Sequence, residues 1–270
     1  MKYTFFLDID GTLIHAGNRY PTEALLRIMK EAQKDGHRFF INTARSYGNV
    51  DPKQFPIERF DGLCSGCGTC ITYDGKMIYE NLIPPKRVFE VAEHIISSQP
   101  DLKFVLEGIK ALYPKPYNPW NPVAAYAFES VAELKERFPD IDVQKLATFA
   151  GEFITEKTAE ALLKDFDVYF HPNYTEIVPK GYSKGKAAEI VEKLLGVPHE
   201  ATVAIGDSHN DVPMFQSCAI AIAMGNAPEV VKKEADIVTE QVADDGAAKA
   251  IARLCGISYS RILNEIGANK

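Results

Sequence analysis

The segment DIDGT at residues 8–12 places two carboxylates, Asp8 and Asp10, two residues apart directly after a short apolar run. If the backbone stays extended there, side chains at positions i and i+2 point to the same face. Two such carboxylates can hold a hard cation such as Mg²⁺, or divide the roles of nucleophile and acid between them. A solvated Asp-Gly turn is the alternative that this segment alone leaves open.

The segment GDSHND at residues 206–211 adds two more carboxylates, Asp207 and Asp211, and the amide of Asn210. It also follows a buried apolar run. Four carboxylates at one sheet edge would repel one another, and a bound divalent cation removes that conflict. Asp211 could equally serve only as a helix cap, whereas Asp207 is held by the predicted strand end.

Two further positions carry groups suited to an anion. Thr43 follows a predicted strand, and its hydroxyl together with the backbone N–H of Ala44 could hold a phosphate oxygen. Lys184 begins a predicted helix, where a cation gains nothing from the helix dipole. A lysine at that place is easier to explain if it faces an anion, although the segment contains no P-loop string.

The elements that must position these residues can be read from apolar runs. Short buried runs at 3–7, 39–41, 203–205 and 219–223 are typical of strands, and amphipathic patterns predict helices at 21–35 and 184–195, with another from about residue 211. Strand, helix and strand at this spacing indicate βαβ units and a parallel sheet. Ligands bind such sheets at the carboxyl ends of the strands, where the segments with Asp8, Thr43 and Asp207 fall.

The middle of the chain has a different composition. Residues 84–178 are rich in proline and aromatic residues, above all in the tract at 113–122, and helical patterns at 88–96, 131–138 and 158–163 alternate with short strand candidates. We interpret this as a second α+β domain inserted into the first. The expected division is therefore a core made of residues 1–83 and 179–270 and an insertion at 84–178.

These four motifs, in this order, resemble the haloacid dehalogenase-like superfamily of phosphoryl-transfer enzymes, and the resemblance covers essentially the whole chain. It implies a three-layer α/β, Rossmann-like core with a mainly parallel sheet, and an inserted α+β cap of type IIB that selects the substrate. Residues 177–185 and the late Asp244-Asp245-Gly246 resemble the Cof-type branch, which consists mostly of phosphatases of sugar phosphates and related small esters.

The resemblance assigns the chemistry of the first motif and its metal. It implies that Asp8 is the nucleophile and forms an aspartyl-phosphate, and that Asp10 is the general acid and then the base. It implies that Mg²⁺ is the cofactor, held by Asp8, the carbonyl of Asp10 and Asp207.

The other family positions would bind the phosphoryl group. The resemblance places Thr43, Ala44, Lys184 and Asn210 around it, with Asp211 orienting the lysine and the metal shell. The family's second motif usually reads Thr-Gly-Arg, so Ala44 is a departure. Its backbone N–H is retained, but its methyl group narrows the space and disfavours a positive φ.

The resemblance predicts Mg²⁺-dependent hydrolysis of a small phosphate monoester, most simply a phosphorylated sugar. Two alternatives stay open. A phosphomutase similar to the phosphomannomutases would return the phosphoryl group to the substrate, and a non-catalytic protein would only bind a phosphorylated ligand. Release of free phosphate separates the first from the second, and any turnover excludes the third.

Charge and cysteine content limit partners and location. The chain has 37 acidic against 30 basic residues, a formal charge of −7, which argues against a nucleic-acid partner. No apolar run approaches the ~18 residues of a membrane span, so no membrane partner is expected. The apolar start is too short for a signal-peptide core, so we expect a cytoplasmic protein with reduced thiols. The sequence leaves the oligomeric state open.

A run of cysteines, Cys64-x-x-Cys67-x-x-Cys70, has a spacing found in zinc and iron–sulfur sites. A fourth ligand is missing nearby. Strand, turn and strand fits the region better, with Asp74-Gly75 turning the following hairpin. We therefore expect small buried or turn thiols here rather than a metal site.

Overall fold

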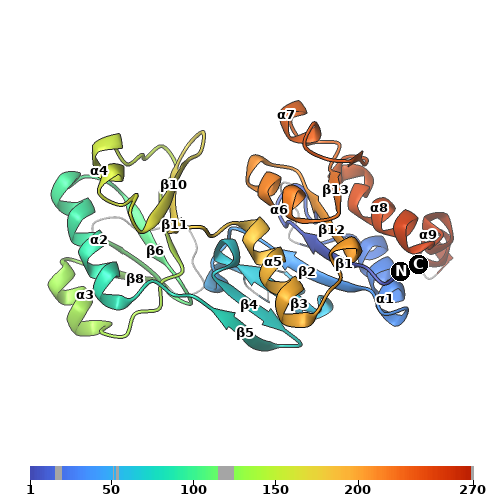
Figure 1. Ribbon diagram of the computed structural model, residues 1–270, viewed down its shortest axis with the longest axis horizontal. Coiled ribbons are helices and arrows are strands. Elements are labelled where there is room, and N and C mark those ends of the chain that lie inside the picture. The colour runs from blue at the N-terminus through green and yellow to red at the C-terminus, as the bar shows by residue number, and fades with distance from the viewer. Residues whose placement is uncertain (16–19, 51, 53–54, 115–124, 269–270) are drawn as a thin grey trace. The chain divides into compact units, whose positions relative to one another are not determined.

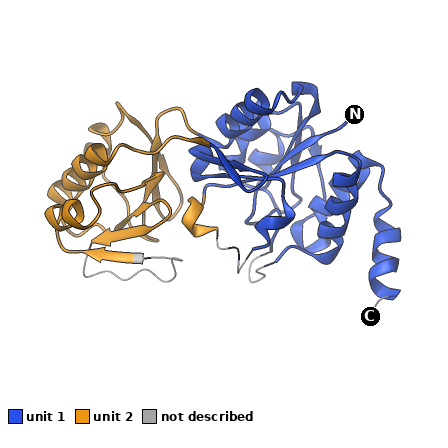
Figure 2. Cartoon of the chain, turned by 90° about the horizontal axis from the view of Figure 1, so that it is seen from below, with its two compact units in different colours: residues 1–44, 52–78, 183–270 blue, residues 45–51, 79–182 orange. Residues whose placement is uncertain are grey.

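The computed structural model describes residues 1–15, 20–50, 52, 55–114 and 125–268 of the 270-residue chain. The chain divides into two compact units (Figure 2). Unit 1 consists of Met1–Ala44, Pro52–Ile78 and Ser183–Lys270, and unit 2 of Arg45–Asp51 and Tyr79–Tyr182. No described helix combines the length and the apolar character that crossing a membrane requires.

Unit 1 is built on a mainly parallel sheet in the order β14-β13-β12-β1-β2-β3-β4-β5. Its strands are β1 (Thr4–Leu7), β2 (Arg38–Asn42), β3 (Gly62–Ser65), β4 (Cys70–Tyr73), β5 (Lys76–Glu80), β12 (Thr202–Gly206), β13 (Ile220–Ala223) and β14 (Ile237–Val238). Strands β14 to β3 pair in parallel, and β4 reverses against β3. Strand β1 therefore lies between β12 and β2, which places the first motif beside the motifs that follow those two strands.

Helices cover both faces of this sheet, which gives the three layers predicted from the sequence (Figure 1). The helices of unit 1 are α1 (Glu23–Lys34), α5 (Lys184–Leu195), α6 (Val212–Ser217), α7 (Glu229–Lys232), α8 (Gly246–Cys255) and α9 (Tyr259–Ala268). Helix α1 packs with α8 and α9, and α5 packs with α6. The buried aromatic and aliphatic side chains of β1 and β2, including Phe5 and Phe39, fill the space between the layers.

Local sequence signals explain where α5 begins and ends. Ser183 caps its first turn by accepting a hydrogen bond from the N–H of Lys186 at 3.1 Å. Gly196 ends the helix with a φ of +61°, the left-handed conformation that glycine adopts without strain. The helix runs over 184–195 as predicted. Because Lys184 is the first residue of α5, the cap also fixes the backbone position from which the Lys184 side chain extends.

Unit 2 consists of one sheet with helices on one face (Figure 1). The strand order is β10-β11-β9-β6-β7-β8. The elements are α2 (Pro85–Ser98), β6 (Phe104–Glu107), β7 (Ala111–Pro114), β8 (Ala125–Phe128), α3 (Val131–Arg137), β9 (Lys145–Thr148), α4 (Glu156–Glu160), β10 (Phe166–Phe170) and β11 (Thr175–Pro179). Its own core joins side chains of the helices to strand residues such as Phe104 and Leu146, so the unit has the α+β character expected of the insertion.

Some boundaries differ from the sequence expectation. The helix expected at 158–163 is Glu156–Glu160, because Thr155 caps it earlier by accepting from the N–H of Thr158. Residues 115–124 of the proline-rich tract lie outside the described residues.

The largest difference is the segment Arg45–Asp51, expected in the core and observed in unit 2. The N–H of Tyr47 donates to Gln144 Oε1 at 2.6 Å, and the N–H of Gly48 donates to the carbonyl of Gly108 at 3.0 Å. A Cβ on residue 48 would lie 2.2 Å from the carbonyl oxygen of Ile109, so this close approach requires glycine. The chain thus enters unit 2 directly after Ala44.

Candidate functional site

Strands β1 and β12 bring the two acidic motifs together at one edge of the unit 1 sheet. Leu7 pairs with Ile205 across the two parallel strands, and the N–H of Asp8 donates to the carbonyl of Ile205 at 3.1 Å. Asp8 follows β1 by one residue, and Asp207 follows β12 by one residue. The two carboxylates therefore meet at the carboxyl ends of neighbouring parallel strands, where ligands bind in such sheets.

Lys184 lies buried beside this pair. Its Nζ donates to Asp8 Oδ1 and to Asp211 Oδ1, each at 2.6 Å. The start of α5 is tied to the end of β2, because Asn42 Nδ2 donates to the carbonyl of Lys184 at 2.8 Å. Burial alone would lower the pKa of Lys184, but Asp211 and Asp8 outweigh burial and raise the pKa, so the ammonium stays charged.

Asp211 is fully occupied by contacts within the protein. While Oδ1 accepts from Lys184, Oδ2 accepts from the N–H groups of Asp207 and Ser208, each at 2.9 Å. The loop packs so closely on this carboxylate that a Cβ on Gly206 would lie 2.6 Å from Asp211 Oδ2. Asp211 thus holds both the lysine and the loop that carries Asp207.

The acidic residues form a group suited to a metal ion. Within the described part of the chain, Asp8, Asp207 and Asp211 are the one set of three or more His, Cys, Asp and Glu side chains whose ligand atoms lie within 4.8 Å of one another. Carboxylate oxygens are hard ligands and fit Mg²⁺. Because Asp211 is committed to Lys184 and the loop, Asp8 and Asp207 are the carboxylates of the set that fit a cation.

The electrostatics of the group also favour a cation. Burial raises the pKa of Asp8 to about 7, and the negative charge of Asp211 adds to this against the opposing effect of Lys184. Burial likewise raises the pKa of Asp207 to about 6, with Asp211 and, more weakly, Asp10 adding to it. Lys184 alone does not balance the charges of Asp8, Asp207 and Asp211. A bound divalent cation would lower the pKa of Asp8 and of Asp207 and so favour their charged forms.

The remaining predicted site residues lie around this group. Asp10 is exposed and forms a β-bridge with Ile14 in the loop after β1. Thr43 is buried at the end of β2, where its N–H donates to the carbonyl of Cys64 at 2.9 Å. Ala44 is partly buried and is not among the described residues with a positive φ, so its methyl group causes no backbone strain there.

Asn210 lies in the short 3₁₀ turn His209–Asp211 that follows Asp207. Ser208 Oγ donates to Asn210 Oδ1 at 2.7 Å. Because the carbonyl end of the amide is used in this way, the NH₂ end is the part of Asn210 that can donate to an anion.

Two residues of the site were missed by the sequence reasoning. Thr12 is buried, and its Oγ1 donates to Asp207 Oδ1 at 3.5 Å. Asn226, in the loop after β13, donates from Nδ2 to Asp207 Oδ2 at 3.2 Å. Thr12 was within the first motif, and Asn226 follows a strand that was predicted to end at the same sheet edge. Proximity to a strand end is the signal that would have found both.

The cysteine run does not assemble into a ligand set within the described residues. Cys64 lies in β3 and Cys70 at the start of β4, and the two strands pair antiparallel with Ser65 opposite Cys70. Cys67 occupies the turn between them with a φ of +58°. Asp74 and Gly75, with φ of +50° and +70°, connect β4 to the neighbouring β5, so the strand, turn and hairpin reading of this region is confirmed.

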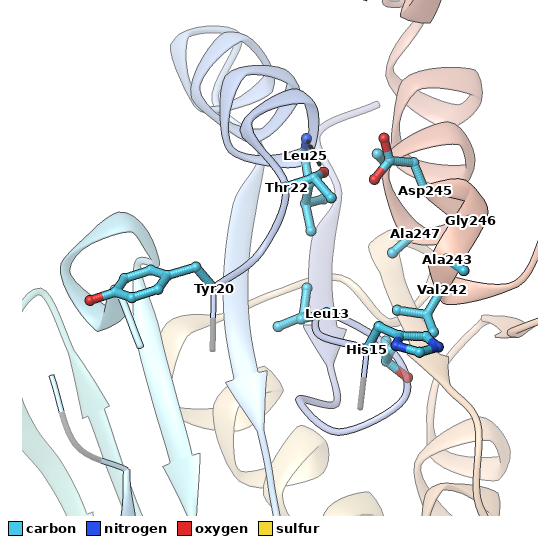
Figure 3. A pocket seen from close by; sticks show the side chains of 12 residues that line it. Leu13, His15, Tyr20, Thr22, Leu25, Val242, Ala243, Asp245, Gly246 and Ala247 are labelled. Atoms are coloured by element: carbon cyan, nitrogen blue, oxygen red, sulfur yellow. Dashed lines mark hydrogen bonds between the residues drawn. The ribbon is translucent and has the colours of Figure 1, made fainter. Parts of the chain in front are cut away.

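A cavity of ≈ 200 Å³ lies within unit 1 (Figure 3). One wall comes from the loop after β1 and the start of α1, and the other from residues 242–248 before and within α8. Thr12, which contacts Asp207, belongs to the first wall. The first wall therefore adjoins the acidic group.

Comparison with known proteins decides the family. The model of the haloacid dehalogenase-like hydrolase family matches residues 5–251. The chain belongs to this family. The match extends over all four motifs and confirms the resemblance seen in the sequence. Together with the phosphatases named below, it also confirms the predicted class of enzyme, a phosphoric monoester hydrolase.

Named relatives and solved structures agree with this membership. A putative phosphatase, YkrA of Bacillus subtilis, is 29% identical over 92% of this chain and 96% of its own. A phosphoglycolate phosphatase of Nitrosopumilus maritimus is 28% identical over 95% and 97%. A haloacid dehalogenase-like hydrolase from Bacteroides thetaiotaomicron superposes with a TM-score of 0.77 at 23% identity over 94% of this chain and 100% of that one.

A sugar phosphatase of the superfamily's subclass IIB superposes with a TM-score of 0.74 at 23% identity, covering 94% of this chain and 99% of that one. Likeness at this identity shows the fold. The predicted fold, a Rossmann-like α/β core with an added α+β unit, is confirmed.

Proposed function

We propose that this chain is a Mg²⁺-dependent phosphatase that hydrolyses small phosphate monoesters, sugar phosphates among them, through an aspartyl-phosphate on Asp8. The observation that carries the proposal is the buried contact of Lys184 with Asp8 and Asp211 beside Asp207. It brings the proposed nucleophile Asp8 and the fixed cation Lys184 together at the carboxyl end of β1. Asp8 and Asp207 are there the two carboxylates suited to a metal.

In the first step, a carboxylate oxygen of Asp8 attacks phosphorus while the bond to the leaving oxygen breaks. Lys184 Nζ offsets the charge of the transferred oxygens, and the Thr43 hydroxyl, the Ala44 N–H and the Asn210 NH₂ group donate to them. Bound Mg²⁺, held by Asp8, Asp207 and the carbonyl of Asp10, would reduce the repulsion between the anionic nucleophile and the anionic substrate.

Asp10 is assigned the proton transfers. It donates a proton to the leaving oxygen, and then accepts one from the water that attacks the phosphorus of the aspartyl-phosphate. The exposed position of Asp10, beside the buried Asp8, suits a residue that must exchange protons with both the leaving group and water. Asp211 takes no proton in this scheme and holds Lys184 in place.

Unit 2 is proposed to select the substrate, which corresponds to the expected role of residues 84–178. All residues assigned to the chemistry lie in unit 1. Exposed aromatic residues of unit 2, such as Tyr126, Tyr169 and Phe170, are suited to sugar contact. Alanine variants of them are expected to reorder the preference among natural esters while changing the rate on p-nitrophenyl phosphate little. Equal losses on both kinds of substrate would contradict this role.

The test of the function is a screen of phosphate esters with detection of free phosphate, with Mg²⁺ and with a chelator. The screen includes hexose phosphates and phosphoglycolate, because relatives of this chain carry sugar phosphatase and phosphoglycolate phosphatase names. Phosphate release that requires Mg²⁺ supports the proposal. Isomerised phosphosugar without phosphate release would indicate a mutase, and no turnover of any ester would contradict the proposal. A cytoplasmic location is part of the same proposal.

A further inference from the structure

Asn226 occupies a bridging position over the end of strand β12. It lies in the loop after β13, and its side-chain Nδ2 donates to the carbonyl of Gly11 at 2.9 Å and to Asp207 Oδ2 at 3.2 Å. Gly11 belongs to the loop after β1, and β12 lies between β13 and β1 in the sheet. One amide therefore spans three neighbouring strand ends and contacts the carboxylate at the central one.

A third contact fixes which way this amide points. The backbone N–H of Val242 donates to Asn226 Oδ1 at 2.9 Å. Because a backbone N–H can only donate, the amide atom that faces Val242 must be the oxygen. The NH₂ group is then directed toward the carbonyl of Gly11 and the carboxylate of Asp207, where two acceptors require it.

The loop contacted by Asn226 fits closely against the same carboxylate. Gly11 has a φ of +84°, and a Cβ there would lie 2.2 Å from Asp207 Oδ2. Thr12 holds the other oxygen of Asp207 from its Oγ1. Hydrogen-bond donors thus contact both oxygens of Asp207. The position of each donor depends on the conformation of the loop after β1.

Asn226 also connects the two walls of the adjacent cavity. Gly11 precedes Thr12 in one wall, and Val242 belongs to the other (Figure 3). The cavity leaves these walls without side-chain packing between them over that space. Through two of its hydrogen bonds, Asn226 links the residue next to one wall with Val242 of the other wall.

We propose that Asn226 is a positioning residue that holds Asp207 in the orientation needed to bind Mg²⁺. Ligand oxygens of Asp8, Asp207 and Asp211 lie within 4.8 Å of one another, so like charges surround the Asp207 carboxylate. The amide NH₂ of Asn226 offsets that repulsion and fixes the carboxylate before the metal arrives. Loss of a partner that orients a metal ligand typically weakens metal binding by about 10- to 100-fold.

The inference rests on the proposed function, and Mg²⁺ binding tests the two separately. Titration calorimetry with Mg²⁺ on the metal-free full chain would compare the wild type with Asn226→Ala and Asn226→Asp, alongside the melting temperature of each. Asn226→Asp has the same shape and still accepts from Val242, but replaces the donor by an acceptor. We expect the dissociation constant for Mg²⁺ to rise at least about 10-fold in both variants.

Gln241→Ala is the matched control. This exposed amide lies one residue before Val242, and its Nε2 donates to Asp244 Oδ2 at 2.9 Å. We expect its Mg²⁺ affinity to stay within about twofold of the wild type, below the effect of an orienting partner.

Unchanged Mg²⁺ affinity in folded Asn226→Asp, with or without a lower melting temperature, would overturn the positioning role and leave the proposed function intact. If Gln241→Ala loses affinity as much as the Asn226 variants, the effect belongs to the loop as a whole and the inference is also overturned. A wild type that does not bind Mg²⁺ would instead overturn the metal assignment of the proposed function.

Discussion

Each compact unit of this protein buries a lysine between two carboxylates, and the two arrangements differ in charge balance. In unit 2, Lys145 pairs with Glu107 across β9 and β6 and contacts Glu176 on β11. His171 Nε2 lies 3.2 Å from the second oxygen of Glu176. Burial alone would raise the pKa of Glu176, but Lys145 and His171 outweigh burial and lower the pKa to about 2.

In unit 1, Lys184 contacts Asp8 and Asp211, and Asp207 lies within the same group. Here burial and carboxylate repulsion prevail over the lysine, and the pKa of Asp8 is raised to about 7. The two buried lysines are alike in their contacts, so the ion pair alone does not mark a functional site.

The two clusters differ in the direction in which the carboxylate pKa is shifted from its ordinary value. A lowered pKa means that the protein itself stabilises the charge, as expected of a structural ion pair. The raised pKa of Asp8 comes first from burial and then from the charge of Asp211, so a bound cation would favour its charged form. We therefore interpret the Lys145 cluster as structural and the Lys184 cluster as the reacting site, and the following changes test that division.

Asp8→Asn is expected to have the largest effect. It removes the nucleophile while keeping the shape of the side chain, and the rate of phosphate release should fall roughly 10³-fold or more. The melting temperature should stay the same or rise, because one buried charge is removed from an overcharged group. Phosphate release at a near-normal rate by the purified variant would exclude Asp8 as the nucleophile.

Lys184→Met should lower kcat roughly 10²- to 10³-fold, because the fixed cation that offsets charge on the transferred oxygens is lost. The assay uses a small aryl phosphate, with folding checked by circular dichroism. Full activity of this variant would show that Lys184 only stabilises the start of α5.

Lys145→Met is the matching change in unit 2. It leaves Glu176 buried without its lysine and should lower the free energy of unfolding by about 3–5 kcal/mol. The rate per folded molecule on the aryl phosphate should stay within a few-fold of the wild type. Denaturant unfolding and the rate assay together check this, and a large loss of rate without loss of stability would reverse the roles assigned to the clusters.

The clusters should also respond to pH in opposite directions. The pKa of Asp8 is raised in the folded protein, so its contribution to stability is present at low pH and is lost as pH rises through about 7. The pKa of Glu176 is lowered, so its contribution is lost only as pH falls toward about 2. The melting temperature of the metal-free protein should therefore fall between about pH 4 and pH 7, and Mg²⁺ should remove this fall. A metal-free melting temperature that rises over this range would contradict the raised pKa.

Ala44→Gly should have the smallest effect. Ala44 does not have a positive φ, so restoring the family's usual glycine relieves no strain. The rate should change by no more than about threefold, and the free energy of unfolding should fall by about 0.4–1 kcal/mol because glycine loses more entropy on folding. A rate gain of tenfold or more would show that the methyl group obstructs the phosphate position.

The parts of the fold that were predictable from the sequence are those set by local patterns. Helix α5 has an apolar face, a serine cap and a glycine stop, and its predicted range agrees with the structure. The apolar runs that form β1 and β12 are short and buried, and parallel pairing brings the residues after them together without further information. The convergence of Asp8 and Asp207 follows from that topology alone.

The parts that were not predictable depend on contacts between distant segments. The segment Arg45–Asp51 joins unit 2 because of Gln144 and Gly108, which no pattern near residue 45 indicates. The Lys145 cluster exists only through the register of three strands. Asn226 follows a predicted strand end, but its contact with Asp207 depends on a loop that is also held by Val242, and no local pattern indicates that contact.

The most direct measurement of the central claim is the mass of the peptide that contains Asp8 after a single turnover. The enzyme would be mixed with a rapidly hydrolysed ester and Mg²⁺, quenched with acid within one turnover and digested. This peptide should carry one phosphoryl group in the wild type and none in Asp8→Asn. Phosphate release by the wild type with no phosphoryl group on that peptide at any quench time would contradict it.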